Sequence, residues 1–224
     1  MKDKDLLKKN TKIIIKKLKE KYGDLECFLT HKNAYELLCA VCLSAQCTDD
    51  RVNMVTPGLF RAYPDPKTLA VAKLKDVEKI IKSCGFYKNK AKNLIKMAQV
   101  LVIEHDSQVP DSMEKLVKLA GVGRKTANVV LGNWFKKSEG VVVDTHVKRI
   151  VNLLGLSSQK DPVKIEQDLN LIVPKKYWDN FSLWLIAHGR ETCVARRPSC
   201  SRCLIKKYCD FHQLKIASSK IYQS

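Results

Sequence analysis

The stretch Leu119-Ala-Gly-Val-Gly-Arg-Lys-Thr-Ala127, followed by Val143-Asp-Thr-His146, decides how this chain is interpreted. Gly121, Val122 and Gly123 predict a tight turn between two helices, because glycine tolerates positive φ and leaves no side chain beside the backbone. N–H groups at the start of the second helix can then converge on one phosphate oxygen. Such a contact binds the nucleic-acid backbone without reading its sequence. The alternative is an ordinary turn that needs glycine only for its geometry.

Lys125 lies in the first turn of the second predicted helix, where the positive end of the helix dipole disfavours a protonated ammonium. Partial burial would increase its free-amine fraction further. A neutral amine can attack an electrophilic sugar carbon and form a Schiff base. The alternative is a phosphate-binding or solvated lysine.

Asp144 follows the apolar run Val141–Val143 and precedes a predicted helix. Beside a nucleophilic lysine it could take up a proton and stabilise positive charge on the sugar. It could equally cap the helix that follows. His146 is a secondary candidate, for which the residue pattern favours a structural role.

The composition points to a polyanionic partner. The 224 residues include 41 Lys and Arg against 23 Asp and Glu, a net charge of +18. This surplus favours nucleic acid or an anionic membrane, with a basic proteome or a solubility role as the alternative. No stretch approaches the roughly 20 apolar residues of a membrane span, and the N-terminus lacks an apolar signal core. We therefore expect an intracellular protein that binds no membrane. A cytoplasmic, nucleoid-associated location and a monomeric state are separate expectations.

Apolar residues recur at helical spacing nearly throughout, and no β-rich region is evident, so the predicted class is all-α. Helices are expected at 6–22, 34–45, 48–63, 66–72, 75–83, 88–105, 113–119, 124–135, 145–154, 163–171 and 177–188. Asp111 and Glu114 form a capping-box pattern. Gly85 is a suitable residue just past a helix end. Residues 141–143 should form a buried connector, and a polar tail should follow the last cysteine.

Four of the nine cysteines crowd into residues 193 to 209 with the spacing Cys-x6-Cys-x2-Cys-x5-Cys: Cys193, Cys200, Cys203 and Cys209. Without an export signal, this crowding favours metal ligation over disulfides. Zinc ribbons generally pair two Cys-x2-Cys knuckles across a longer gap, whereas one knuckle in a compact loop suits a cubane iron–sulfur cluster. A zinc site and a metal-free loop are the alternatives.

Three arginines lie inside this cysteine loop: Arg196, Arg197 and Arg202. They could face DNA phosphates, or they could offset the negative charge of a thiolate-bound cluster. The remaining cysteines are expected to behave as small apolar residues. These are Cys27, Cys39, Cys42, Cys47 and Cys84.

The segments Leu119–Ala127 and Val143–His146 resemble the endonuclease III family of helix-hairpin-helix DNA glycosylases. The family pattern Leu-x-Gly-Val-Gly-x-Lys-Thr-Ala followed by Val-Asp-Thr-His is matched throughout, and the resemblance covers about residues 25 to 211. It also includes Leu43-Ser-Ala-Gln46, Gly85-Phe-Tyr87, His188-Gly-Arg190 and the cysteine cluster.

The resemblance implies a two-domain all-α fold. A helical-barrel domain at 27–138 would bear the helix-hairpin-helix at 113–135. A second domain, residues 1–26 with 139–224, would contain the cluster loop of 193–209. Lesion-containing DNA would bind in a cleft between the two domains.

The resemblance further implies removal of oxidised pyrimidines, such as thymine glycol, from double-stranded DNA, and strand cleavage at the abasic site. Lys125 would be the attacking amine, Asp144 the essential carboxylate, and the cysteine ligands would hold a [4Fe–4S] cluster. Related adenine glycosylases lack the lysine and the strand cleavage, so Lys125 favours the bifunctional branch. The rivals are a monofunctional mismatch glycosylase and a non-catalytic iron–sulfur protein that binds DNA or transfers electrons.

An enzyme of this kind must flip the nucleotide out of the duplex, and other side chains must fill the gap. By resemblance, Gln46 is inserted into the base stack and Phe86 occupies the position of an apolar loop wedge. The alternative for Phe86 is a buried loop anchor. The family commonly has a smaller residue than Cys47 and often an aliphatic one at Phe86, which leaves lesion and opposite-base preference open.

Overall fold

Every regular element in the computed structural model is a helix within residues 3–221, the range that the structure describes, with side chains to Ala217. The all-α prediction is confirmed, and each predicted helix is present. The helices are α1 (Lys4–Tyr22), α2 (Ala34–Ser44), α3 (Asp49–Ala62), α4 (Pro66–Ala70), α5 (Leu74–Ile80), α6 (Tyr87–Glu104), α7 (Met113–Leu116), α8 (Arg124–Asn133), α9 (Thr145–Leu154), α10 (Pro162–Ile172), η1 (Lys175–Tyr177), α11 (Trp178–Glu191), η2 (Cys200–Arg202), η3 (Lys206–Tyr208) and α12 (Asp210–Ile221).

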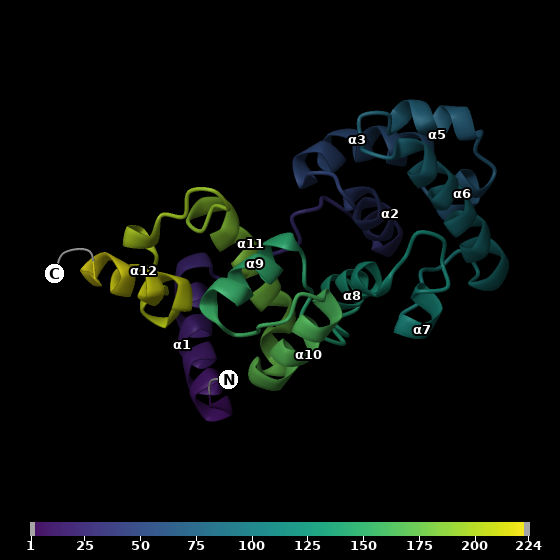
Figure 1. The fold of residues 1–224 in the computed structure, drawn as a ribbon. Helices are drawn as coiled ribbons and strands as arrows, with labels where there is room; N and C mark the ends of the chain where they lie inside the picture. The colour runs from purple at the N-terminus through teal and green to yellow at the C-terminus, as the bar shows by residue number, and fades with distance from the viewer. Residues whose placement is uncertain (1–2, 222–224) are drawn as a thin grey trace. The chain divides into compact units, whose positions relative to one another are not determined.

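The chain divides into two compact units (Figure 1). Unit 2 is Cys27–Glu139, and unit 1 combines the residues before Cys27 with those from Gly140 onward. In unit 2, α2 is apolar on nearly every side and is buried along most of its length. It packs against α3, α6 and α8. The loops that carry Gln46 and Phe86, two candidate DNA-contacting residues, adjoin the end of α2 and the start of α6 and are therefore anchored by this core.

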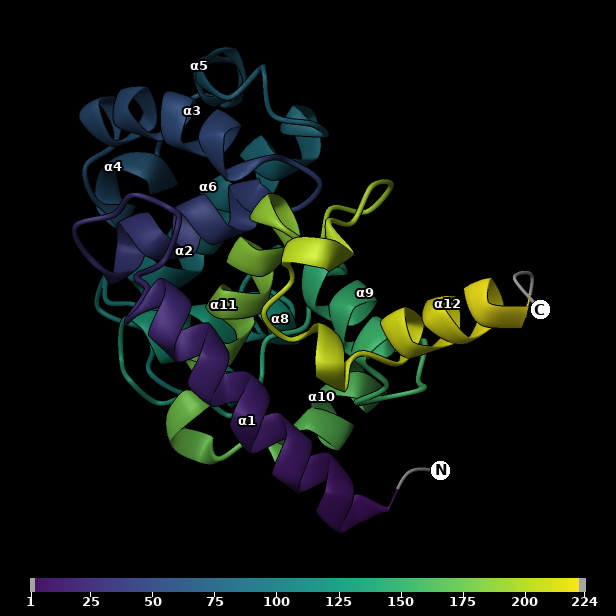
Figure 2. The ribbon, with the colours of Figure 1, turned by 90° about the vertical axis from the view of Figure 1, so that its left-hand side faces the viewer.

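Unit 1 is built around α11, which packs against α1 and α9 (Figure 2). Phe181 and Trp184 of α11 are completely buried, because the apolar faces of the surrounding helices turn toward them. The Trp184 indole N–H donates to the carbonyl oxygen of Gly23 at 2.7 Å, which ties the end of α1 to this core. Val141–Val143 are buried outside any helix, as predicted, and lead directly into α9.

The predicted capping box before α7 is wrong. The helix begins after Ser112 without a side-chain cap and ends at Leu116. The Asp111 carboxylate pairs instead with Lys137, and Glu114 pairs with Lys118 at 3.0 Å. Each carboxylate therefore finds a cation in place of the backbone N–H groups that a capping box would use.

Two other local predictions are also wrong. Gly85 does not follow a helix end, because α5 stops at Ile80. Glycine suits this position for a different reason: a Cβ there would lie 3.2 Å from the Gln46 carbonyl oxygen. The expected polar tail contains α12, which packs against α9. The polar composition did not predict this helix, although Gln, Leu and Lys are good helix formers.

Candidate active site and cluster loop

The glycine turn leaves the start of α8 open. Gly121 has a φ of 79°, and a Cβ there would lie 3.0 Å from the Asn93 side-chain amide nitrogen, so both conformation and space require glycine. Val122 is buried and anchors the turn, with its N–H donating to Leu119 at 3.1 Å. Gly123 is the N-cap of α8, which has no side-chain cap, and the space beside its Cα is open. An anion can therefore approach the first N–H groups of α8.

Lys125 lies in the first turn of α8 with an exposed side chain. The partial burial considered from the sequence is absent, and the side chain lies near the positive end of the α8 dipole. The neighbouring Arg124 is directed to the Glu139 carboxylate, 3.9 Å away. The Lys125 amine is thus accessible to a substrate beside the turn.

Asp144 is the N-cap of α9, and its Oδ1 accepts the Val147 N–H at 2.8 Å. Its side chain is half-buried. The capping alternative is therefore confirmed, and it leaves the second carboxylate oxygen available for chemistry. Asp144 belongs to unit 1 and Lys125 to unit 2.

His146 packs against α11. A Cβ at Gly189 would lie 2.8 Å from His146 Nδ1, so the glycine of the His-Gly-Arg sequence permits this close contact. Nδ1 is buried without a hydrogen-bond partner among the described residues. This packing agrees with the structural role that the sequence favoured for His146.

Gln46 and Phe86 share an unusual backbone conformation. Their φ angles are 53° and 56°, in the left-handed region that non-glycine residues seldom adopt. Gln46 is exposed and Phe86 is 64% exposed, so the buried-anchor alternative for Phe86 is wrong. The close approach of Gly85 to the Gln46 carbonyl places the two loop tips side by side.

Sequence reasoning missed one residue in this region. Lys90 of α6 is a buried lysine, 9% exposed, whose Nζ donates to the Leu43 carbonyl oxygen at 2.8 Å. A usable signal was its place on the apolar face of α6, beside buried Ala91 and Leu94. A charge at such a position is uncommon unless it has a partner.

The four cysteines of the loop face a common hollow. Its lining includes Cys193, Cys200, Cys203 and Cys209 together with Leu153, Pro198 and Phe211. Among residues 3–217, no three His, Cys, Asp or Glu side chains converge closely enough to hold a single metal ion. A cubane cluster does not require that convergence, because each thiolate binds a different iron. The residues present therefore fit a four-thiolate cluster.

The surroundings of these thiols affect their ionisation. Burial raises the pKa values of the Cys193, Cys203 and Cys209 thiols. The Arg149 guanidinium opposes that shift at Cys193, to whose Sγ it donates at 3.6 Å. Arg149 thus partly offsets the effect of burial at Cys193, and bound iron would likewise favour the thiolate form.

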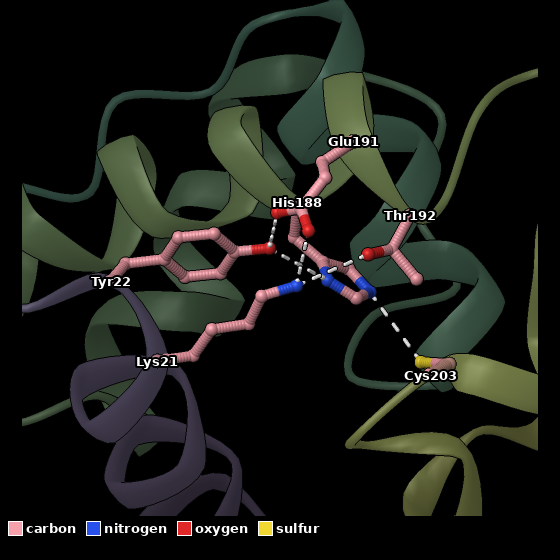
Figure 3. A network of polar contacts seen from close by, with 6 residues as sticks. All are labelled: Lys21, Tyr22, His188, Glu191, Thr192 and Cys203. Carbon is pink, nitrogen blue, oxygen red and sulfur yellow. Dashed lines mark hydrogen bonds and ion pairs between the residues drawn. The ribbon is translucent and has the colours of Figure 1, made fainter.

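A polar network joins the end of α1 to the cysteine loop (Figure 3). The His188 ring lies between Cys203 Sγ, 3.5 Å from Nε2, and the Tyr22 hydroxyl, 3.4 Å from Nδ1. The Tyr22 hydroxyl donates to Glu191 at 3.0 Å, and Lys21 Nζ donates to the same carboxylate at 2.7 Å. These contacts fix the ring beside a candidate cluster ligand. The sequence singled out His188 only as part of the family resemblance.

The three loop arginines, Arg196, Arg197 and Arg202, are all exposed. Their exposure suits either reading of the sequence, contact with DNA phosphates or offset of cluster charge. Within residues 3–221, no helix is long and apolar enough to span a membrane.

Comparison with known proteins gives the family. The HhH-GPD superfamily base excision DNA repair protein pattern matches residues 39–175. Endonuclease III of Synechocystis sp. is 48% identical over 197 residues, covering 88% of this chain and 89% of the relative. The chain belongs to the endonuclease III family. The Escherichia coli K12 endonuclease III is 37% identical over 200 residues, covering 89% of this chain and 94% of that protein.

A solved structure agrees with this assignment. A trapped endonuclease III–DNA covalent intermediate superposes with a TM-score of 0.88 at 37% identity, covering 93% of this chain and 98% of that one. The predicted resemblance to the endonuclease III family and its helix-hairpin-helix glycosylase fold is confirmed.

Proposed function

We propose that this endonuclease III family member removes oxidised pyrimidines, such as thymine glycol, from double-stranded DNA and cleaves the strand 3′ to the resulting abasic site. Its family membership makes it a bifunctional DNA glycosylase and abasic-site lyase of base excision repair. The observation that carries the proposed route is the accessible Lys125 amine, in the first turn of the helix that follows the glycine turn. A family relative trapped in covalent linkage to DNA supports a covalent route.

In the proposed mechanism, the neutral Lys125 amine attacks C1′, and the damaged base leaves with the bonding electron pair and gains a proton. Opening of the sugar ring gives a Schiff base between Lys125 and C1′. The positively charged imine makes the C2′ proton acidic. When a base removes that proton, the C2′–H electron pair forms a double bond and the 3′ phosphate leaves.

Asp144 would act on charge and protons in this sequence. Its carboxylate can stabilise positive charge developing on the sugar and can accept a proton from the attacking amine. Its hydrogen bond from the Val147 N–H supports this role, because a capped carboxylate is held in one orientation.

The DNA contacts divide into backbone and stack contacts. Gly121, Val122 and Gly123 would hold a phosphate against the start of α8. Gln46 and Phe86 would enter the base stack when the damaged nucleotide is flipped out. The exposed Arg196 and Arg197 would add phosphate contacts from the cysteine loop.

We also assign a [4Fe–4S] cluster to Cys193, Cys200, Cys203 and Cys209, which line one hollow. When bound, such a cluster can carry an electron on its iron atoms. The proposed base removal and strand cleavage use only amine and carboxylate chemistry. The cytoplasmic, nucleoid-associated location and the monomeric state stay predictions.

The proposed function is tested on an end-labelled duplex with a single thymine glycol. We expect base loss accompanied by strand cleavage 3′ to the lesion, without added alkali. Base loss with an intact strand would replace the proposal with a monofunctional glycosylase. DNA binding without base loss would replace it with a non-catalytic binding protein.

A further inference from the structure

Lys90 carries a charged side chain at a buried position, where an unpaired charge is energetically unfavourable. Its side chain is 9% exposed, and its Nζ donates to the Leu43 carbonyl oxygen at 2.8 Å. Leu43 lies in the last turn of α2, whose carbonyl oxygens form the negative end of the helix. The Lys90 side chain therefore supplies this carbonyl with a donor, and an apolar side chain would leave the carbonyl without one.

Lys90 also bonds to Phe86, the second of the two loop residues proposed to enter the base stack. The backbone N–H of Lys90 donates to the Phe86 carbonyl oxygen at 3.1 Å. Leu43 lies three residues before Gln46 in the chain. Lys90 thus contacts both loops. Its backbone bonds to Phe86, and its side chain bonds to the end of α2, which leads to Gln46.

One further observation shows that these segments lie close together, and another shows that the backbone of each is constrained. A Cβ at Gly85 would lie 3.2 Å from the Gln46 carbonyl oxygen, so the two backbones approach directly. Gln46 and Phe86 both hold left-handed φ angles. Such conformations persist in non-glycine residues only when the surrounding structure imposes them.

Charge near the thiols supports the position of the ammonium. Burial raises the pKa of Cys42 to about 12 and that of Cys84 to about 11, and the Lys90 charge opposes both shifts. Cys42 belongs to α2, whereas Cys84 immediately precedes Gly85. The ammonium therefore lies near both segments that it would hold together.

We propose that Lys90 is a positioning residue for stack opening: it holds the end of α2 and the start of α6 together so that Gln46 and Phe86 enter the duplex as a pair. This inference rests on the proposed roles of Gln46 and Phe86. In this role the buried Lys90 would touch neither the sugar nor the base. Loss of its bond to Leu43 allows the two tips to move independently.

The test uses Lys90→Met, which keeps the chain length but removes the charge and the donor. Two variants on the same helix serve as controls. Leu101→Ala removes a completely buried side chain from the far part of α6 and reports on general destabilisation. Lys96→Met removes an exposed charge and reports on the net charge alone.

Two quantities are measured with full-length protein on a thymine glycol duplex. The first is the single-turnover rate of base removal. The second is the fluorescence rise of an adenine analogue placed beside the lesion, which reports unstacking of the bases on binding. The measurements are made at a temperature where thermal melts show every variant folded.

For Lys90→Met we expect a base-removal rate about tenfold lower and a smaller fluorescence rise at saturating protein. Both controls should keep the wild-type fluorescence rise. A wild-type rate and rise for Lys90→Met would overturn the inference, as would an equal loss in Leu101→Ala. If Gln46→Ala keeps the full rise, the wedge role is wrong and the inference fails with it. If the wild type removes no base, the proposed function itself is wrong.

Discussion

The Asp144 carboxylate accepts the Val147 N–H at 2.8 Å, so the carboxylate proposed to handle charge at the sugar is also the N-cap of α9. One residue thus joins a folding role to a chemical one. The two roles are separable, because asparagine caps helices about as well as aspartate but carries no charge.

Substitution at Asp144 should separate stability from activity. Asp144→Asn should unfold at nearly the wild-type urea concentration while base removal slows by about 100-fold or more. Asp144→Ala should lose a similar amount of activity and also about 1 kcal/mol of stability. Single-turnover rates and urea unfolding measure the two effects. An Asp144→Asn enzyme with the wild-type rate would refute the chemical role.

The features that sequence predicted well are local ones. The turn at Gly121 and Gly123, the helix periods and the spacing of the cysteines each lie within a short segment, where residue type and spacing carry the information. The failed capping box at Asp111 shows the limit. Lys137, distant in sequence, is the partner that Asp111 takes in the fold.

The features that sequence missed depend on contacts between distant segments. The bond from Lys90 to Leu43 joins α6 to α2, and the Tyr22–His188 contact joins α1 to α11. The chain contains many lysines and several tyrosines, and spacing alone does not show that Lys90 and Tyr22 are the ones that make these contacts. The exposure of Lys125 is likewise a property of the folded surface, which the sequence did not provide.

The two glycines of the turn should behave differently. Gly121→Ala places a Cβ at a positive φ and 3.0 Å from the Asn93 amide nitrogen, so we expect a loss of about 1–3 kcal/mol in stability. Gly123→Ala faces open space and should cost less stability, within about 1 kcal/mol because alanine is a poorer N-cap than glycine. It should also weaken affinity for undamaged duplex, because its methyl group lies beside the proposed phosphate position. Urea unfolding and DNA titration test this pair. Equal stability losses in both variants would contradict the account of the turn.

The purified protein should contain iron and acid-labile sulfide in about equal amounts, near four of each per chain. Cys203→Ala should lower both, because it removes one of the four thiolates. Cys39→Ala is the matched control, since Cys39 is buried in the core of unit 2, whereas the cysteine loop belongs to unit 1. Metal and sulfide assays give the answer. Zinc without sulfide in the wild type would exclude the assigned cluster.

The Glu191 carboxylate should make stability depend on pH. Hydrogen bonds from Lys21 and Tyr22 lower its pKa in the folded protein. A lowered folded pKa stabilises the native state above the unfolded pKa of about 4.3, and that stabilisation is lost as pH falls through the folded value. Glu191→Gln should therefore be less stable than wild type near neutral pH and should approach it in acid. A stability difference independent of pH in urea unfolding would argue against this ion pair.

Borohydride reduction on abasic-site duplex tests the central claim, a Schiff base on Lys125, most directly. We predict that wild-type protein gives a stable protein–DNA adduct whose modified peptide contains Lys125. Lys96→Gln, which removes an exposed lysine on α6, should trap at the wild-type yield. Lys125→Gln should give no adduct. Full-yield trapping by Lys125→Gln, or no adduct with the wild type, would contradict the account.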